Sequence, residues 1–136
     1  MAGDRFNAAM GMFKVRVRVT NPSDASRFFE DEFWVDTGAL YSFAPEDRLE
    51  GIGIDPALSR NVILADGRRE NLRFGEARMT VEGLGETLTC PVVFGPKGSL
   101  YRLGATALET FGVDADPVGK RLKPVAAVIG AFLASK

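Results

Sequence analysis

One stretch of the chain carries an apolar strand directly into a polar turn: Phe33-Trp34-Val35-Asp36-Thr37-Gly38-Ala39. Its first three residues end a predicted strand over 27–35, and Asp36 follows with no spacer. A carboxylate in that place lies at the edge of the core, where its charge is partly desolvated. Gly38 has no Cβ, so backbone amides can approach and orient the carboxylate, while the Thr37 hydroxyl needs a partner if it is buried. The stretch predicts a carboxylate held for chemistry at a strand end.

The tripeptide Asp-Thr-Gly also has an ordinary interpretation. In a chain of this length it arises by chance on the order of a few per cent of the time. An Asp and a Gly after a strand also form a common turn. The surrounding pattern therefore has to decide between the two interpretations.

The absence of histidine restricts the possible chemistry. The 136 residues include no His and one Cys, which excludes Ser-His-Asp and Cys-His catalysis, histidine-ligated zinc and thiolate metal clusters. If the protein is an enzyme, its acid–base chemistry runs on carboxylates, with Lys, Tyr or the lone Cys as weaker candidates. Cys90 lies in the apolar run 88–93, where we expect a buried structural thiol.

Length and charge predict one domain that binds neither nucleic acid nor membrane. The apolar fraction of 46% and the charged fraction of 26% are those of an ordinary globular protein. A net charge of −1 without a basic run argues against a nucleic-acid partner. The first residues lack the apolar core of a signal peptide, and the apolar run 125–134 is too short to span a bilayer. We expect a cytoplasmic protein with a single domain over residues 1–136.

Alternating apolar residues and turn signals predict many short strands and two short helices. Asp66-Gly67, between two extended runs, predicts a two-residue hairpin turn. Helices are predicted over 45–50 and over 104–111, the second with Ala105, Leu108 and Phe111 on one face and ended by Gly112. The predicted strands are 13–20, 27–35, 62–65, 68–74, 77–81, 86–94, 100–103, 113–115 and 121–125. With no βαβ rhythm, this pattern predicts a mostly β barrel or sandwich.

Several features in this order resemble a retropepsin-like (retroviral-type) aspartic protease, over roughly residues 13–125. The segment 35–39 resembles the family's catalytic loop, and Ser42 falls where the family often has Ser or Thr. The hairpin around Ala65-Asp66-Gly67 stands where the family has its mobile flap. Leu103-Gly104 and the helix that follows resemble the family's apolar-Gly turn and helix. The resemblance implies a closed β-barrel with one or two short helices and a flap hairpin.

The resemblance also implies roles for particular residues. Asp36 would be the catalytic aspartate, Thr37 would hydrogen-bond across a dimer, and Gly38 would contact the substrate backbone. The implied substrate-binding residues are Ala39, Leu64, Ala65, Asp66, Gly67 and Leu103. Because the chain has one Asp-Thr-Gly, the resemblance implies a homodimer in which two aspartates share a proton and activate water. The implied substrate is an extended polypeptide, and no metal or cofactor is expected.

Some features depart from the family pattern. Arg102 stands where the family usually has an apolar residue, so it either points outward or perturbs the loop behind the active site. Arg68, Arg69 and Glu70 make the flap tip less glycine-rich than in viral enzymes. The tail 126–136 has no counterpart, and we expect it to pack on the domain itself rather than on a partner chain.

Other interpretations stay open at this point. A non-catalytic member would keep the fold and the dimer but serve as a peptide-binding or scaffolding module. A structural β-domain with a chance Asp-Thr-Gly would be a monomer. Trp34 and the phenylalanines are expected in the core, and Asp66, Asp114 and Asp116 are expected to form turns, the last two rather than a metal pair.

Overall fold

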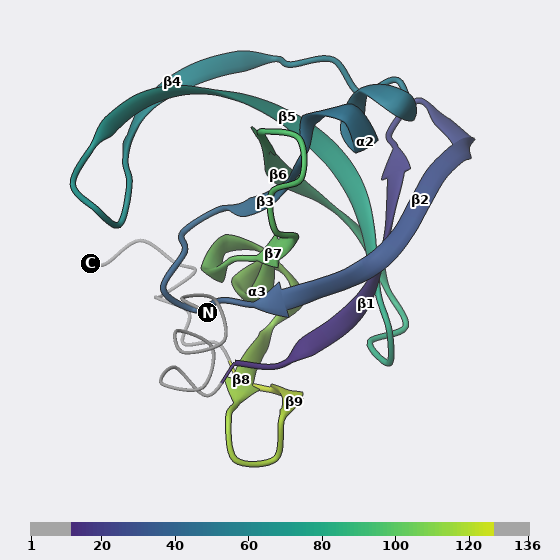
Figure 1. Ribbon diagram of the computed structural model, residues 1–136. Helices are drawn as coiled ribbons and strands as arrows, with labels where there is room; N and C mark the ends of the chain where they lie inside the picture. The colour runs from purple at the N-terminus through teal and green to yellow at the C-terminus, as the bar shows by residue number, and fades with distance from the viewer. Residues whose placement is uncertain (1–11, 127–136) are drawn as a thin grey trace, which may run out of the picture.

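The computed structural model describes residues 12–126, which form a β-rich structure with two short helices (Figure 1). The strands are β1 (Lys14–Asn21), β2 (Asp24–Val35), β3 (Ser42–Pro45), β4 (Leu58–Ile63), β5 (Arg69–Val81), β6 (Thr87–Gly95), β7 (Arg102–Leu103), β8 (Val113–Asp116) and β9 (Arg121–Pro124). The helices are α2 (Glu46–Gly51) and α3 (Ala105–Phe111). The predictions of a mostly β fold and of two short helices are confirmed. The predicted tail, from residue 127 on, lies outside the described residues.

The strands of the main sheet form a ring. Their order is β1-β2-β7-β3-β6-β5-β4, and an additional antiparallel pairing between β1 and β5 closes the first six strands on themselves. Strand β4 pairs with β5 outside this closure, and β8 and β9 form a separate two-stranded sheet. The parallel pairings β2–β7 and β3–β6 join segments that are distant in sequence. Of the expected closed barrel, the structure shows a ring of six strands.

Alternating residues of the ring strands fill its interior. Val17 and Val19 of β1 and Met79 of β5 are fully buried, as expected for period-2 strands with one face on the core. Cys90 of β6 is buried as predicted, and this burial raises the pKa of its thiol to about 11. The core prediction is wrong for Phe28, which is 43% exposed under the guanidinium of Arg18.

The β4–β5 hairpin extends from the ring and arches away from it (Figure 1). Strand β5 is continuous over Arg69–Val81, where two strands were predicted, because it pairs with β4 along its first half and with β6 and β1 along its second. Strand β4 begins four residues before the predicted start at 62. Its first half, Leu58 to Arg60, continues into a further polar residue, Asn61, without an alternating pattern, and becomes a strand through pairing with β5.

The hairpin turn is one residue longer than predicted. The Leu64 N–H donates to the Arg68 carbonyl (2.8 Å) and the Gly67 N–H donates to the Leu64 carbonyl (2.9 Å), so residues 65–67 form a three-residue loop. Gly67 has φ +86°, the left-handed conformation that ends such loops. The prediction of a two-residue turn is therefore wrong, although the hairpin itself is confirmed.

Two boundaries around α3 also differ from the predictions. The predicted strand over 100–103 contracts to the two residues of β7, and Gly104 precedes α3 with an extended backbone instead of starting the helix. The buried face of α3 consists of Ala107, Leu108 and Phe111, so Ala105 was placed on it wrongly. Gly112 ends the helix in the left-handed conformation, as predicted. Within residues 12–126, no helix is long and apolar enough to cross a membrane.

Candidate active site

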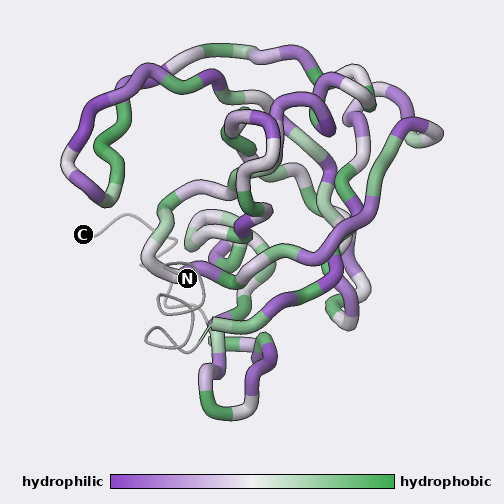
Figure 2. The backbone as a smooth tube through the Cα atoms, viewed as in Figure 1, coloured by the Kyte–Doolittle hydropathy of each residue, from purple (hydrophilic) through white to green (hydrophobic). Residues whose placement is uncertain are grey.

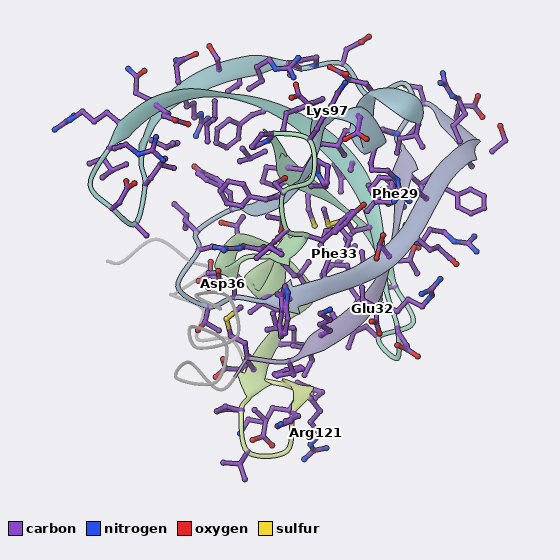
Figure 3. The ribbon with its side chains drawn as sticks, in the orientation of Figure 1. Phe29, Glu32, Phe33, Asp36, Lys97 and Arg121 are labelled. Atoms are coloured by element: carbon purple, nitrogen blue, oxygen red, sulfur yellow. The ribbon has the colours of Figure 1, made fainter. Side chains whose placement is uncertain are left out.

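Asp36 is a buried carboxylate directly after strand β2 (Figure 3). The residue is 2% exposed, and among the described residues Asp36 and Ser42 are the two polar residues that are buried. Its backbone N–H donates to the carbonyl of Leu103 (2.9 Å), and its Oδ1 accepts the N–H of Gly38 (3.0 Å). Backbone contacts therefore fix both the position of Asp36 and the orientation of its carboxyl group, as the sequence pattern predicted.

The segment after Asp36 is fastened to β7 and α3 through its backbone. The N–H groups of Ala105 and Thr106, at the start of α3, donate to the carbonyls of Ala39 (2.8 Å) and Leu40 (2.9 Å). The N–H groups in the first turn of a helix have no hydrogen-bond acceptor within the helix, so they are available to the two carbonyls. The helix start therefore holds residues 36–41, which we call the Asp36 loop.

Gly104 and Ser42 complete this attachment. A Cβ on Gly104 would lie 2.5 Å from the carbonyl oxygen of Tyr41 and 2.9 Å from that of Ala39, distances that no side chain can occupy. The Gly104 N–H donates to the buried Oγ of Ser42 (3.0 Å). The apolar-Gly turn and the Ser of the sequence pattern thus have a physical role: they let β7 and the Asp36 loop pack backbone against backbone.

The outer side of the Asp36 loop is exposed. Thr37 and Gly38 are exposed, Ala39 is half-buried, and Leu40 is 60% exposed. A buried carboxylate thus lies next to a surface that offers a hydroxyl, a bare backbone and an apolar side chain.

The predicted flap residues lie together at the tip of the β4–β5 hairpin. Leu64 is half-buried, and Ala65, Asp66 and Gly67 are exposed. The residues directly before the tip, 62–65, are hydrophobic and those directly after it, 68–71, are hydrophilic (Figure 2). The predicted residues thus form two groups, one at the hairpin tip and one around Asp36.

Asp66 forms the turn at the hairpin tip. Its Oδ1 accepts the N–H of Arg68 (3.0 Å), and its Oδ2 accepts the guanidinium Nε of Arg68 (2.7 Å). These two bonds hold the pKa of Asp66 below its usual value. The turn-forming role expected from the sequence is confirmed. Asp116 has the same kind of role in the β8–β9 turn, where its Oδ1 accepts the N–H groups of Val118 and Gly119.

Leu103 was predicted to bind substrate but lies in the core, and the residue before it, Arg102, reaches Asp36. The Leu103 side chain is fully buried in the hydrophobic core, so it cannot contact a substrate in this structure, and its carbonyl positions Asp36 instead. The guanidinium of Arg102 donates from Nη1 to Oδ2 of Asp36 (3.1 Å), an ion pair in which the arginine side chain is 34% exposed and the aspartate 3%.

The register of β2 and β7 explains this ion pair. In their parallel pairing, Trp34 lies beside Arg102 and Val35 beside Leu103. Side chains alternate along a strand, so Trp34, Asp36 and Arg102 share one face while Leu103 points into the core. In the sequence, Arg102 was noticeable because it stands where the resembled family usually has an apolar residue. The sequence did not identify Asp36 as the partner of Arg102, because that depends on the register of β2 and β7.

A second arginine connects the hairpin to the Asp36 loop. The Nη1 of Arg60, in β4, donates to the hydroxyl of Tyr41 (3.0 Å), and the Tyr41 ring packs edge-on against Phe74 of β5 (4.8 Å between centroids). A cavity of about 280 Å³ lies here. Besides these three residues, it is lined by Ala57, Leu58, Gly75, Glu76 and Pro91. The base of the hairpin therefore has direct contact with the loop that carries Asp36.

A smaller cavity of about 220 Å³ adjoins Asp36 on the side of β8. Its lining is mainly apolar and includes Thr37 and a second carboxylate, Asp114. Within residues 12–126, no group of three or more His, Cys, Asp or Glu side chains could hold a metal ion.

Comparison with known proteins supports the fold. No protein-family model matches the sequence, and no curated protein matches it. Among solved structures, the chain is similar to the foamy viral protease-reverse transcriptase, whose structure was solved in complex with an RNA/DNA hybrid. The TM-score is 0.52 at 14% sequence identity, and the match covers 85% of this chain and 13% of that one. At this identity the likeness concerns the fold alone, and the chain spans a small part of that protein's length.

Proposed function

We propose that the protein is an aspartic-type peptide hydrolase that acts as a homodimer, with Asp36 of each chain as the catalytic residue. The observation that carries the proposal is the setting of Asp36: a buried carboxylate at a strand end, oriented by backbone bonds and bordered by an exposed Thr-Gly segment. The fold-level likeness to a viral protein that contains a protease is consistent with it.

The dimer follows from the number of carboxylates that the chemistry needs. General acid–base hydrolysis of a peptide bond uses one carboxylate as base and one protonated carboxyl as acid. The chain has one Asp-Thr-Gly, and Asp114, the other carboxylate of the cavity beside Asp36, lies at an exposed position of β8. We therefore assign the second carboxylate to a second copy. The exposed Thr37, Gly38 and Leu40 would form the contact around the two-fold axis. There the Thr37 hydroxyl would find the partner that it needs.

In the proposed dimer, hydrolysis would proceed as follows. Two aspartates that meet across the axis share one proton, because like charges that close cannot both ionise easily. The ionised carboxylate removes a proton from water while the water oxygen bonds to the scissile carbonyl carbon, and the other carboxyl hydrogen-bonds the carbonyl oxygen. The C–N bond then breaks as the leaving nitrogen takes up the proton that the carboxylate removed from water. An extended polypeptide would lie along the Asp36 loop, with Ala39 beside it and residues 64–67 closing over it.

A non-catalytic peptide-binding module is the second candidate. The observation that favours it is the Arg102–Asp36 ion pair, because a guanidinium occupies an oxygen of the carboxylate that the chemistry would use. On that alternative the protein keeps the dimer and the hairpin but does not hydrolyse its ligand.

The deciding experiment compares the protein with its Asp36→Asn variant on a mixed peptide library from acidic to neutral pH. We expect cleavage by the native chain alone. Its rate should increase more than linearly with enzyme concentration when that concentration is near the dimer dissociation constant. Cleavage by both proteins would point to another nucleophile or to contamination. A folded dimer that cleaves nothing at any pH would favour the binding module, and a monomer by sedimentation would contradict both candidates.

A further inference from the structure

We propose that Arg102 determines substrate specificity, selecting peptides that carry an acidic side chain next to the bond that is cut. The inference rests on the proposed function and names the substrate class of that same site. It starts from the ion pair of Arg102 with Asp36, which the fold builds from residues far apart in sequence.

The two partners of the ion pair differ in exposure. The Asp36 side chain is 3% exposed, whereas the Arg102 side chain is 34% exposed. Solvent, and therefore a ligand, reaches the Arg102 side chain more easily than that of Asp36. A ligand that approaches Asp36 meets Arg102 at the same time, because the two groups are 3.1 Å apart.

A carboxylate is the ligand group that fits this position best. A guanidinium binds carboxylates through parallel, charge-assisted hydrogen bonds that are stronger than neutral ones. A substrate carboxylate can replace Asp36 as a partner of Arg102, which frees Oδ2 of Asp36 for water or a shared proton. A neutral side chain offers no such exchange, so its peptide meets an aspartate that is still paired.

The charges around the Asp36 loop favour the same ligand. Arg60 lies at the other end of the loop, with its guanidinium on the Tyr41 hydroxyl, so cations are present at both ends. The cavity that Asp36 shares with Asp114 is unfavourable for an anion, because Asp114 repels it. We therefore expect the acidic side chain on the Arg102 side of Asp36.

The test uses pairs of peptides that differ only in Asp against Asn, or Glu against Gln, on either side of a bond that the enzyme cuts. We expect kcat/KM to be higher for the acidic peptide by at least about tenfold, the ratio that a hydrogen bond between charged groups supports. In Arg102→Leu this ratio should fall to near one, mainly because the neutral peptide improves. Arg102→Lys keeps a positive charge and should retain part of the preference.

Arg18→Leu is the matched control. It removes an exposed arginine whose partner, Glu30, lies six residues before Asp36 along β2, away from the strand end that carries the site, and it should leave the ratio unchanged. Far-UV circular dichroism of each variant establishes that it is folded. A native ratio near one, or a high ratio that survives in Arg102→Leu, would overturn the proposal.

A binding arm separates this proposal from the function on which it rests. Asp36→Asn cannot perform the chemistry but keeps Arg102, so the same peptide pairs can be titrated into it by fluorescence anisotropy. We expect the acidic peptide to bind more tightly, and the difference to vanish in Asp36→Asn/Arg102→Leu. If the native chain cuts nothing while this difference is present, the protease function fails and the specificity stands. Equal binding of both peptides, or no binding of either, would overturn it.

Discussion

The Asp36 loop and the β4–β5 hairpin carry the two groups of candidate site residues, and the chain holds them in opposite ways. The loop is fixed by backbone hydrogen bonds from β7 and α3, around the buried Ser42 and Gly104. The hairpin beyond its base is exposed and is held mainly by its own ladder and by side chains such as Arg60. The difference indicates that the Asp36 loop is held more firmly than the hairpin, for which we expect the lower local stability.

Two glycines give the strongest test of this comparison. In Gly104→Ala the new methyl group would meet the backbone of Tyr41 and Ala39, which cannot yield, although the φ of −93° suits any residue. In Gly67→Ala the methyl group has open space around it, and only the left-handed backbone opposes it. We expect Gly104→Ala to lower the free energy of unfolding by about 3 kcal/mol or more, and Gly67→Ala by about 1 kcal/mol. Urea denaturation measures both, and an equal or larger loss in Gly67→Ala would contradict the comparison.

A smaller effect is expected from two polar truncations. Ser42→Ala removes the buried hydroxyl that accepts the Gly104 N–H and leaves that N–H unsatisfied, which should cost about 1–3 kcal/mol of unfolding free energy. Asn71→Ala is the counterpart in the hairpin, because it removes an exposed side-chain bond to Asn61. Its cost should stay within about 0.5 kcal/mol. A Ser42→Ala protein as stable as the native one would show that water satisfies the Gly104 N–H and that this attachment is weaker than its burial indicates.

The sequence predicted the parts of the site that depend on local patterns. Asp36 directly after a strand, the hairpin around Asp66-Gly67 and the helix ended by Gly112 follow from alternation, turn chemistry and capping. The three-residue turn was missed because Asp-Gly fits loops of two or three residues, and the choice between them depends on the strand register.

The contacts between distant segments could not be predicted. Strand β7 has two residues, too few for a periodic pattern, and its register beside β2 decides that Arg102 reaches Asp36. The Arg60–Tyr41 contact and the β1–β5 pairing that closes the ring have the same origin. A single sequence contains no signal for register between strands that are joined by long connections.

The connection between the two regions can be weakened without removing either one. Tyr41→Phe deletes the hydroxyl that accepts from Arg60 and keeps the ring that packs on Phe74. We expect a change in unfolding free energy below about 1 kcal/mol, and hydrogen exchange of the β4 amides faster by roughly threefold. Exchange in the Asp36 loop should not change, because its backbone bonds remain.

Tyr101→Phe is the matched control for this experiment. It also removes a hydroxyl that accepts from an arginine, Arg48, but both residues of this pair belong to segments other than β4 and β5, so β4 exchange should stay at its native rate. Faster exchange in both variants would indicate a general loss of stability. Unchanged exchange in Tyr41→Phe would mean that the ladder with β5 alone determines the opening of the hairpin.

The smallest expected effect lies at the hairpin tip and depends on pH. The N–H and then the guanidinium of Arg68 lower the pKa of Asp66 from its ordinary value of 3.8. A lowered pKa means that the bonds to Asp66 are fully present above 3.8 and are lost as pH falls through the lower value in the folded protein. Titration of the Asp66 carboxyl carbon and the Arg68 amide by NMR should give one common midpoint below 3.8. Arg68→Gln keeps the backbone N–H but loses the guanidinium, so its midpoint should move part of the way back. A native midpoint at 3.8 would mean that the tip is not held in solution by this side chain, and the hairpin would then be still looser, relative to the Asp36 loop, than its hydrogen bonds indicate.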